Sequence, residues 1–138
     1  MTDISITAGN VVPGSGSVIR RGTLGATLTQ GTVLALNSSN QLVACDVDHA
    51  TAALRTPVGI LLTGGASGQP CLYLTKGPIT IGGTVEVGKV YVASDTAGGI
   101  MPTNDLETGD YTSVIGIGRT SAIIDVQIQQ GTVAAVVA

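Results

Sequence analysis

The only histidine of the chain, His49, lies in the densest group of side chains that could do chemistry. It follows Asp46 and Asp48, and two carboxylates beside an imidazole are groups that can hold a metal ion. The spacing, however, matches neither a zinc-ligand pattern nor the loop of an EF-hand. Aspartate is also an ordinary turn residue, because its side chain bonds to the nearby backbone. We therefore expect a turn at this point and no metal.

Patterns for nucleophilic catalysis and phosphate binding are missing from the sequence. A Ser–His or Cys–His pair would have to use His49, and no G-x-S-x-G motif is present. There is no G-x-x-x-x-G-K-[ST] loop. The run Gly116-Ile117-Gly118 imitates the start of a dinucleotide fingerprint, but it lies among residues typical of strands, with no helix to follow. We therefore expect no enzyme activity and no cofactor.

The two cysteines, Cys45 and Cys71, lie inside or beside apolar runs. No apolar run approaches the ~18 residues that a membrane-spanning helix needs, and the first ten residues lack the basic and apolar regions of a signal peptide. These features predict synthesis in the cytoplasm, where disulfides are rare. We therefore expect two free thiols that pack as small hydrophobic side chains.

The composition is unusual for a free-standing globular domain. Charged residues make up 11% of the chain, against roughly 25% in a typical soluble protein. Phe and Trp are absent and Tyr occurs three times, so a core must consist of Val, Ile, Leu and Ala, which favours sheets. The low charge favours burial of part of the surface in an assembly. The net charge of −3 argues against binding to nucleic acid.

The elements that must form this core occur twice. At an offset of 57 residues, ten of the 41 positions from 23 to 63 are identical to positions 80 to 120. The run TLGATLTQGTVLAL then lies over TIGGTVEVGKVYVA, and PVGILLT lies over VIGIGRT. With three residues fewer in the second copy, LYLTKG also lies over VQIQQG. A repeated unit of this kind decides the fold class.

Glycines recur at equivalent positions of the two copies. Gly31 and Gly88 precede expected strands, and Gly59 and Gly116 lie within apolar runs. Glycine inside a strand marks a bulge, a bend or the close approach of another backbone. We predict an all-β fold, a small β-barrel or β-sandwich built from two related halves of about 55 residues, with an extended N-terminal arm.

The predicted organisation is an arm over residues 1–21 and a β domain over residues 22–138. The domain contains the repeat, at 22–77 and 79–131, and an apolar tail, at 132–138, which we expect to close the sheet or to enter a subunit interface. Two alternatives stay open for the arm. It is either the first strand of the domain, or a segment that adds a strand to a partner's sheet. The arm residues proposed to contact a partner are Thr2, Ile4, Ile6, Val11 and Val12.

The stretch from Gly31 to Gly77 resembles the head decoration proteins of tailed phages, the family typified by the decoration protein of phage lambda. The resemblance is carried by TVLALNSSNQLVA, by PVGILL and by LYLTKG. In the second half, GKVYVASDTAGGIMP and VIGIGRT are similar to segments of phage capsid cement proteins. The chain departs from the lambda protein in its duplicated core segment and in its scarcity of aromatic residues.

This resemblance implies a β-tulip-like fold and a structural protein without a catalytic site. It implies a homotrimer on the outer surface of the expanded phage head, made in the host cytoplasm, that clamps neighbouring major capsid proteins. It also implies that the arm pairs with a strand of the capsid protein. The alternative function is a module of a phage tail, fibre or baseplate that binds the host surface. Neither function requires a cofactor, a metal, a membrane or nucleic acid.

Overall fold

The computed structural model describes residues 4, 6–46, 54, 56–94, 96–103 and 111–134, with the backbone alone at 111–112 and 130–134. The described chain consists of strands and turns, with one short 3-10 helix, η1 (Ala8–Asn10). The prediction of an all-β fold is therefore confirmed.

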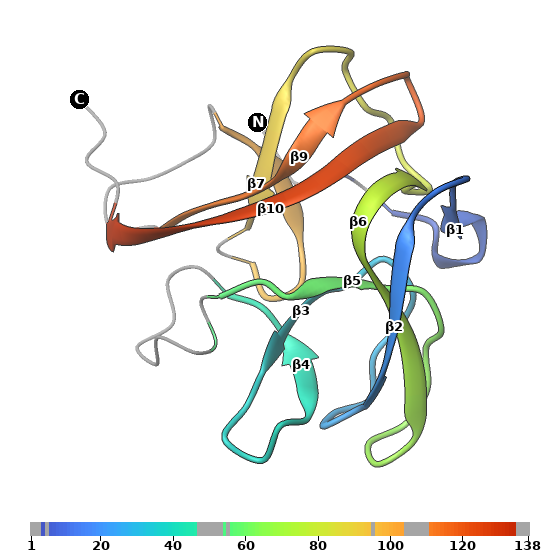
Figure 1. Cartoon of the computed structure of the whole chain (residues 1–138), viewed down its shortest axis with the longest axis vertical. Coiled ribbons are helices and arrows are strands. Elements are labelled where there is room, and N and C mark those ends of the chain that lie inside the picture. The colour runs from blue at the N-terminus through green and yellow to red at the C-terminus, as the bar shows by residue number, and fades with distance from the viewer. Residues whose placement is uncertain are drawn as a thin grey trace.

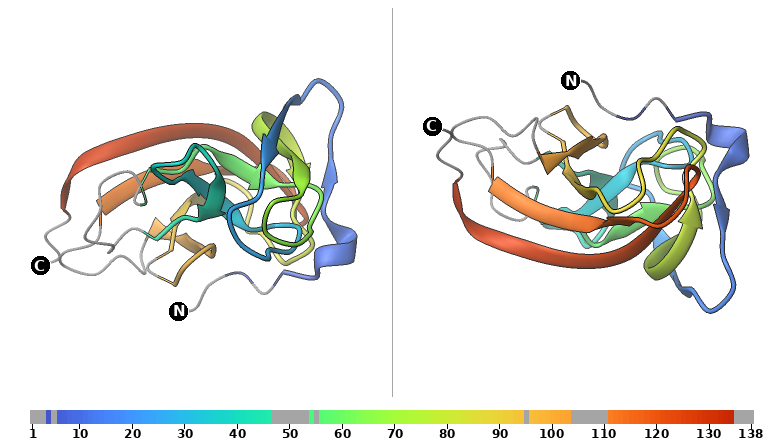
Figure 2. Two further views of the ribbon diagram at one scale, coloured as in Figure 1. Left: turned by 90° about the horizontal axis from the view of Figure 1, so that it is seen from below. Right: turned by 90° about the horizontal axis from the view of Figure 1, so that it is seen from above.

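Ten strands form one antiparallel sheet that curls into a half-barrel (Figure 1). Its main path runs in the order β4-β3-β5-β6-β10-β9-β7-β8, and β1 and β2 both pair with β6. The long strand β10 bends around the outside of the molecule (Figure 2). In chain order the strands are β1 (Val12–Pro13), β2 (Val18–Thr23), β3 (Val33–Leu36), β4 (Leu42–Ala44), β5 (Gly59–Leu61), β6 (Pro70–Thr80), β7 (Val90–Ala93), β8 (Ile100–Pro102), β9 (Tyr111–Gly118) and β10 (Ile123–Ala134).

The sequence repeat corresponds to a structural repeat. Strands β3 to β6 form the first copy, β7 to β10 form the second, and both are linked in the same order. Val33 pairs with Ile60 in the first copy, and the equivalent Val90 pairs with Ile117 in the second. The β3–β4 and β7–β8 pairs differ in register by one residue. Strands β6 and β10 join the two copies at the middle of the sheet.

Equivalent turns in the two copies use the same hydrogen bonds. The N–H of Gly31 donates to the carbonyl of Leu61 over 2.8 Å, as the N–H of Gly88 donates to Gly118 over 2.7 Å. Asn37 at the end of β3 accepts a bond from the N–H two residues ahead, and Ser94 does the same after β7. Short polar side chains of this kind fix turns locally, so the repeated sequence gives repeated hairpins.

Alternation along the strands divides the interior into two hydrophobic clusters. The main cluster lies inside the curl and takes residues from both copies, among them Val33, Ile60, Leu74, Ile115 and Ile124. The second cluster lies on the other face of the first copy and consists of Leu24, Leu34, Leu42, Leu61 and Cys71. Consecutive strand residues point to opposite faces. Burial of both faces therefore explains the continuous apolar runs of β3 and β5.

The N-terminal segment runs along its own domain. Val12 pairs with Thr80, and β2 pairs with residues 70–76 of β6 from Val18 to Thr23. Before β1, the N–H of Ile4 donates to Ile100 and the N–H of Thr7 donates to Gly82, each over 2.8 Å. Residues 12–13 and 18–23 thus form outer strands of the chain's own sheet.

The predicted C-terminal tail is described in part. Strand β10 continues to Ala134, whose backbone pairs with Tyr111, so residues 132–134 extend the sheet. Residues 135–138 lie outside the described chain. No helix within the described residues is long and apolar enough to cross a membrane.

Candidate functional site: an exposed face on β1, β2 and β6

The groups that could do chemistry are not assembled in the part of the chain that the structure describes. His49 and Asp48 lie outside the described residues. Among the Cys, Asp and Glu side chains that the structure describes, no three lie close enough together to hold a metal ion. Cys45 and Cys71 are both free and buried.

Both thiols are held in the protonated form. Burial raises the pKa of Cys45 to about 12, and the negative charge of Asp46 adds to this effect. Burial also raises the pKa of Cys71, and a hydrogen bond with the backbone of Gly22 partly offsets the shift. Because the thiolate is the nucleophile, neither cysteine is activated for catalysis at neutral pH.

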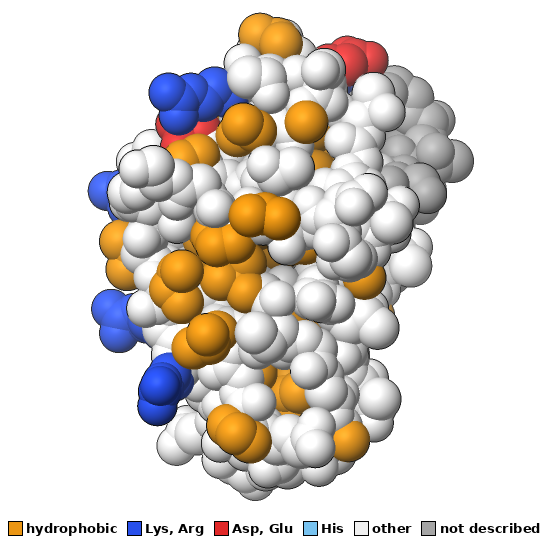
Figure 3. All heavy atoms as spheres, turned by 90° about the vertical axis from the view of Figure 1, so that its right-hand side faces the viewer, with side chains coloured by type: hydrophobic (Ala, Val, Ile, Leu, Met, Phe, Trp, Pro, Cys, Tyr) orange, Lys and Arg blue, Asp and Glu red, His pale blue; other side chains and the backbone are white. Residues whose placement is uncertain are grey.

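Four of the seven large apolar side chains that are exposed in the described chain lie on three neighbouring strands. Val12 is 53% exposed, Val18 45%, Ile19 43% and Leu72 36%. They lie on β1, on β2 and on the part of β6 that pairs with β2. A space-filling view of this side shows a band of apolar side chains (Figure 3). We call the surface formed by β1, β2 and the adjoining part of β6 the interaction face.

Basic side chains belong to the same face. Arg20 and Arg21 are exposed on β2, and Lys76 is exposed on β6, where it pairs with Val18. Basic side chains border the apolar band in Figure 3. No carboxylate of the described residues forms an ion pair with any of these three. Half of the six basic residues of the chain therefore lie near the apolar band without an ion pair to a described carboxylate.

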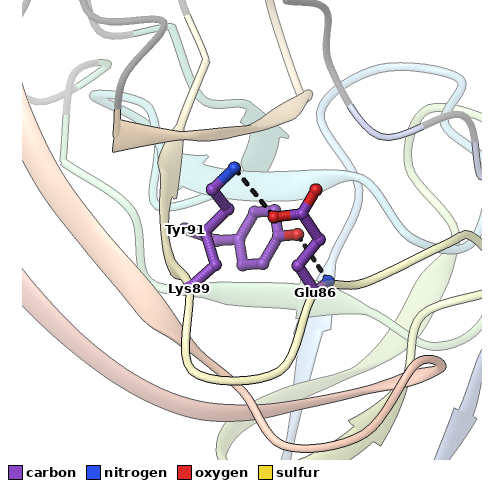
Figure 4. Close-up of polar contacts among 3 residues, drawn as sticks. All are labelled: Glu86, Lys89 and Tyr91. Carbon is purple, nitrogen blue, oxygen red and sulfur yellow. Dashed lines mark hydrogen bonds and ion pairs between the residues drawn. The ribbon is translucent and has the colours of Figure 1, made fainter.

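A cation of the second copy shows the contrasting arrangement. Lys89, before β7, forms an ion pair with Glu86 over 2.9 Å (Figure 4). The N–H of Glu86 also donates to the hydroxyl of Tyr91 over 3.0 Å. Lys89 thus forms an ion pair within its own turn, whereas Arg20, Arg21 and Lys76 form no ion pair with a described carboxylate.

A shallow groove lies at one end of the interaction face. Its lining consists of Arg21, Thr63, Pro70, Cys71 and Leu72. The hydroxyl of Thr63 accepts a hydrogen bond from the N–H of Leu72 over 2.8 Å, so its position is fixed. The groove combines an apolar lining with one guanidinium. It can therefore take an apolar side chain beside a carboxylate.

The proposed arm residues divide between the core and the surface. Ile4 and Ile6 pack against the main cluster, and Val11 is 8% exposed within it. Of the proposed contact residues that the structure describes, Val12 alone is strongly exposed, and Thr2 lies outside the described chain. Val18, Ile19 and Leu72 were not among the residues predicted from the sequence to contact a partner. The available signal was the adjacent pair Arg20-Arg21 in an extended run, which is typical of an edge strand.

The repeated glycines lie at equivalent places. Gly31 and Gly88 have φ angles of +88° and +80°, a region that favours glycine. Gly59 and Gly116 are buried on β5 and β9. A Cβ at Gly59 would come within 2.6 Å of the carbonyl oxygen of Leu74, and one at Gly116 would collide with the carbonyl oxygen of Asp125. These glycines belong to the scaffold rather than to the interaction face.

Comparison with known families found no family model that matches the chain, and comparison with curated proteins found no match.

Proposed function

We propose that this chain is a structural capsid decoration protein, a cement protein that binds the outer surface of an expanded phage head. In this role it clamps neighbouring major capsid proteins and acts as a homotrimer, made in the host cytoplasm and located on the virion. It needs no catalytic group, cofactor, membrane or nucleic acid for this task.

The observation that carries the proposal is the interaction face. Exposed Val12, Val18, Ile19 and Leu72 stand on a chain with only 11% charged residues. Contiguous exposed apolar surface marks sites of protein association, and specific interfaces are depleted of charge at their centres. The segment that resembles phage decoration proteins, residues 31–77, also covers most of the first copy of the repeat, from β3 into β6.

The physical logic of a cement protein fits this arrangement. A ligand that binds only the assembled shell stabilises that shell by mass action. A trimer that contacts several capsid subunits at once gains avidity beyond that of each contact. One exposed face per chain, held on a continuous sheet, is sufficient for this mechanism.

The direct test is binding to undecorated expanded heads. We expect the purified protein to co-sediment with the heads and to raise their thermal transition. Light scattering of the free protein should give the mass of a trimer. Absence of both co-sedimentation and thermal stabilisation would rule the proposal out. Binding of the protein to tails or to host cells instead would support the alternative module.

A pair of variants tests whether the interaction face is responsible. Val18→Glu with Ile19→Glu places charges in the apolar band and should weaken head binding by at least about tenfold, as expected for residues at an interface centre. Val87→Glu is the matched control, because Val87 is 71% exposed and lies on neither β1, β2 nor β6. Equal binding of both variants would place the contact elsewhere.

A further inference from the structure

Strand β2 has one occupied and one open edge. Its inner edge pairs with β6 from Val18 to Thr23, and none of the other strands in the described chain pairs with these residues. Directly after β2, Leu24 forms a parallel bridge with Leu42 of β4, so the open part of the edge lies over the earlier residues of β2. Every residue of β2 except Gly22 is exposed. An open edge presents backbone N–H and C=O groups that can pair with another extended segment.

The two arginines of β2 lie on either side of this edge. Arg20 pairs with Tyr73 and Arg21 pairs with Leu72. Consecutive strand residues point to opposite sides of a sheet. Within the interaction face, one guanidinium therefore borders the open edge on each side of the sheet. Val18 and Ile19 are exposed at the start of the strand, where the register with β6 shifts by one residue. A strand added at this edge would therefore meet cations beside one half and apolar side chains beside the other.

We propose that the open edge of β2 binds an extended acidic segment of a partner protein by strand addition. The segment runs antiparallel to β2 and carries two consecutive acidic residues opposite Arg21 and Arg20, followed by two apolar residues opposite Ile19 and Val18. This inference deepens the proposed function and depends on it for the protein that supplies the segment, which is then the capsid protein.

Charge and shape both select this occupant. Arginine binds carboxylates through two parallel hydrogen bonds, and Arg20, Arg21 and Lys76 have no carboxylate partner among the described residues. On one face, Arg21 also borders the groove that Thr63, Pro70, Cys71 and Leu72 complete. A basic segment would be repelled at the same edge, and an uncharged one would leave the guanidinium groups without partners.

The probe is the peptide GTEEVITG, with GTKKVITG as its charge-reversed control. Each is titrated into the full-length, isotope-labelled protein, and the amide resonances are followed. We expect GTEEVITG to shift the amides of residues 18–23 and to bind at least about tenfold more tightly than GTKKVITG. Binding should weaken as the salt concentration rises. The outward amides of β2 should also exchange more slowly with solvent.

The double variant Arg20→Glu/Arg21→Glu should reverse the preference, so that GTKKVITG binds more tightly. Reversal is a gain of binding, which an unfolded variant cannot show. Arg119→Glu makes a charge change of the same kind on the exposed residue after β9 and should leave the preference for GTEEVITG unchanged.

Three results would overturn the inference. The first is equal binding of the two peptides, or binding of neither, since charges that merely protect an edge from aggregation repel the basic peptide without binding the acidic one. The second is a set of shifts remote from β2. The third is concentration-dependent protection of β2 amides without peptide, which would assign the edge to a second copy of the chain. If the protein binds heads but not the acidic peptide, this inference alone is wrong. If the protein binds the acidic peptide but not heads, the proposed function is wrong.

Discussion

The two copies of the repeated unit share their backbone and differ in their surroundings. The β3–β5 and β7–β9 pairs have the same register, and the turns at Gly31 and Gly88 have the same left-handed conformation. However, β6 of the first copy carries β1 and β2 along one edge. No described strand covers β10 in that way. The two copies thus share one backbone scaffold. Only the first copy also carries the N-terminal strands, and these strands form the interaction face together with β6.

Contacts at the two turns show the same difference. Gly31 is buried, and a Cβ there would lie 2.7 Å from Cγ2 of Ile6 and 3.2 Å from Cγ2 of Val11. Gly88 has no neighbouring atom within 4 Å of the same position. The N-terminal segment therefore covers the turn of the first copy and leaves that of the second open. Equivalent backbone geometry predicts equal strain in both turns, and unequal packing predicts unequal sensitivity.

The largest effects are expected where the copies are alike. Gly59→Ala and Gly116→Ala should each lower the free energy of unfolding by about 2–4 kcal/mol, because the new methyl group meets the backbone of the neighbouring strand. Gly9→Ala is the control, since no atom lies within 4 Å of its Cβ position. Chemical denaturation measures all three. A neutral result at Gly59 or at Gly116 would show that the copies are not equally packed.

The next effect concerns the junction between the copies. The N–H of Gly98, from the second copy, donates to the carbonyl of Cys45 over 2.7 Å, and burial raises the Cys45 pKa from 9.0 to about 12. Between these values an unfolded chain loses the thiol proton while the folded chain retains it. Stability is therefore complete below pH 9 and falls as the pH rises, by up to about 1.4 kcal/mol per pH unit.

Denaturation at pH 8 and at pH 10.5, under reducing conditions, measures this loss. The wild type should lose about 2 kcal/mol more than Cys45→Ala between the two values, because the variant lacks the titrating group. Each protein serves as its own reference at pH 8, so the cavity that the substitution leaves does not enter the comparison. An identical pH dependence in both proteins would show that Cys45 titrates normally and that the junction is open to water.

The turns at Gly31 and Gly88 should differ in how much stability an alanine substitution costs. Ala at Gly31 or at Gly88 should cost about 1–2 kcal/mol from the left-handed backbone alone, and Gly31→Ala should cost more because of Ile6. Truncating Ile6 to Ala should relieve part of the cost at Gly31 and none of it at Gly88. A double-mutant cycle measures this coupling. Equal coupling of Ile6 to both glycines would contradict the asymmetry.

The sequence was sufficient to predict the shared parts of the fold and insufficient to predict what distinguishes the copies. Apolar residues and glycines at an offset of 57 locate β3 and β7, and β5 and the end of β9. The pairing of β2 with β6 leaves no such signal, because almost every position of β2 is exposed and no alternation of apolar and polar residues identifies its partner. The interaction face depends on that pairing, so Val18, Ile19 and Leu72 could not be grouped in advance.

The smallest effect concerns the positions at which the two turns use different chemistry. In the second copy, Glu86 and Lys89 form an ion pair. The equivalent residues of the first copy are Thr29 and Thr32, and there the hydroxyl of Thr32 donates to the carbonyl of Thr29 over 2.7 Å. The exposed fractions of the Glu86 and Lys89 side chains are 64% and 25%. An ion pair of this kind contributes about 0.2–1 kcal/mol.

We expect the exchange Glu86→Thr/Lys89→Thr to change the free energy of unfolding by less than about 0.5 kcal/mol. The effect is small because the hydroxyl of Tyr91 still accepts the N–H of residue 86 and Gly88 still supplies the left-handed residue. The exchange should also remove the dependence of this contribution on salt, since a threonine hydroxyl bonded to a carbonyl is not screened as two charges are. Denaturation at low and at high sodium chloride measures both quantities. A loss well above this value would mean that the ion pair, rather than the repeated backbone, holds the second turn, and the two turns would then be alike in shape only.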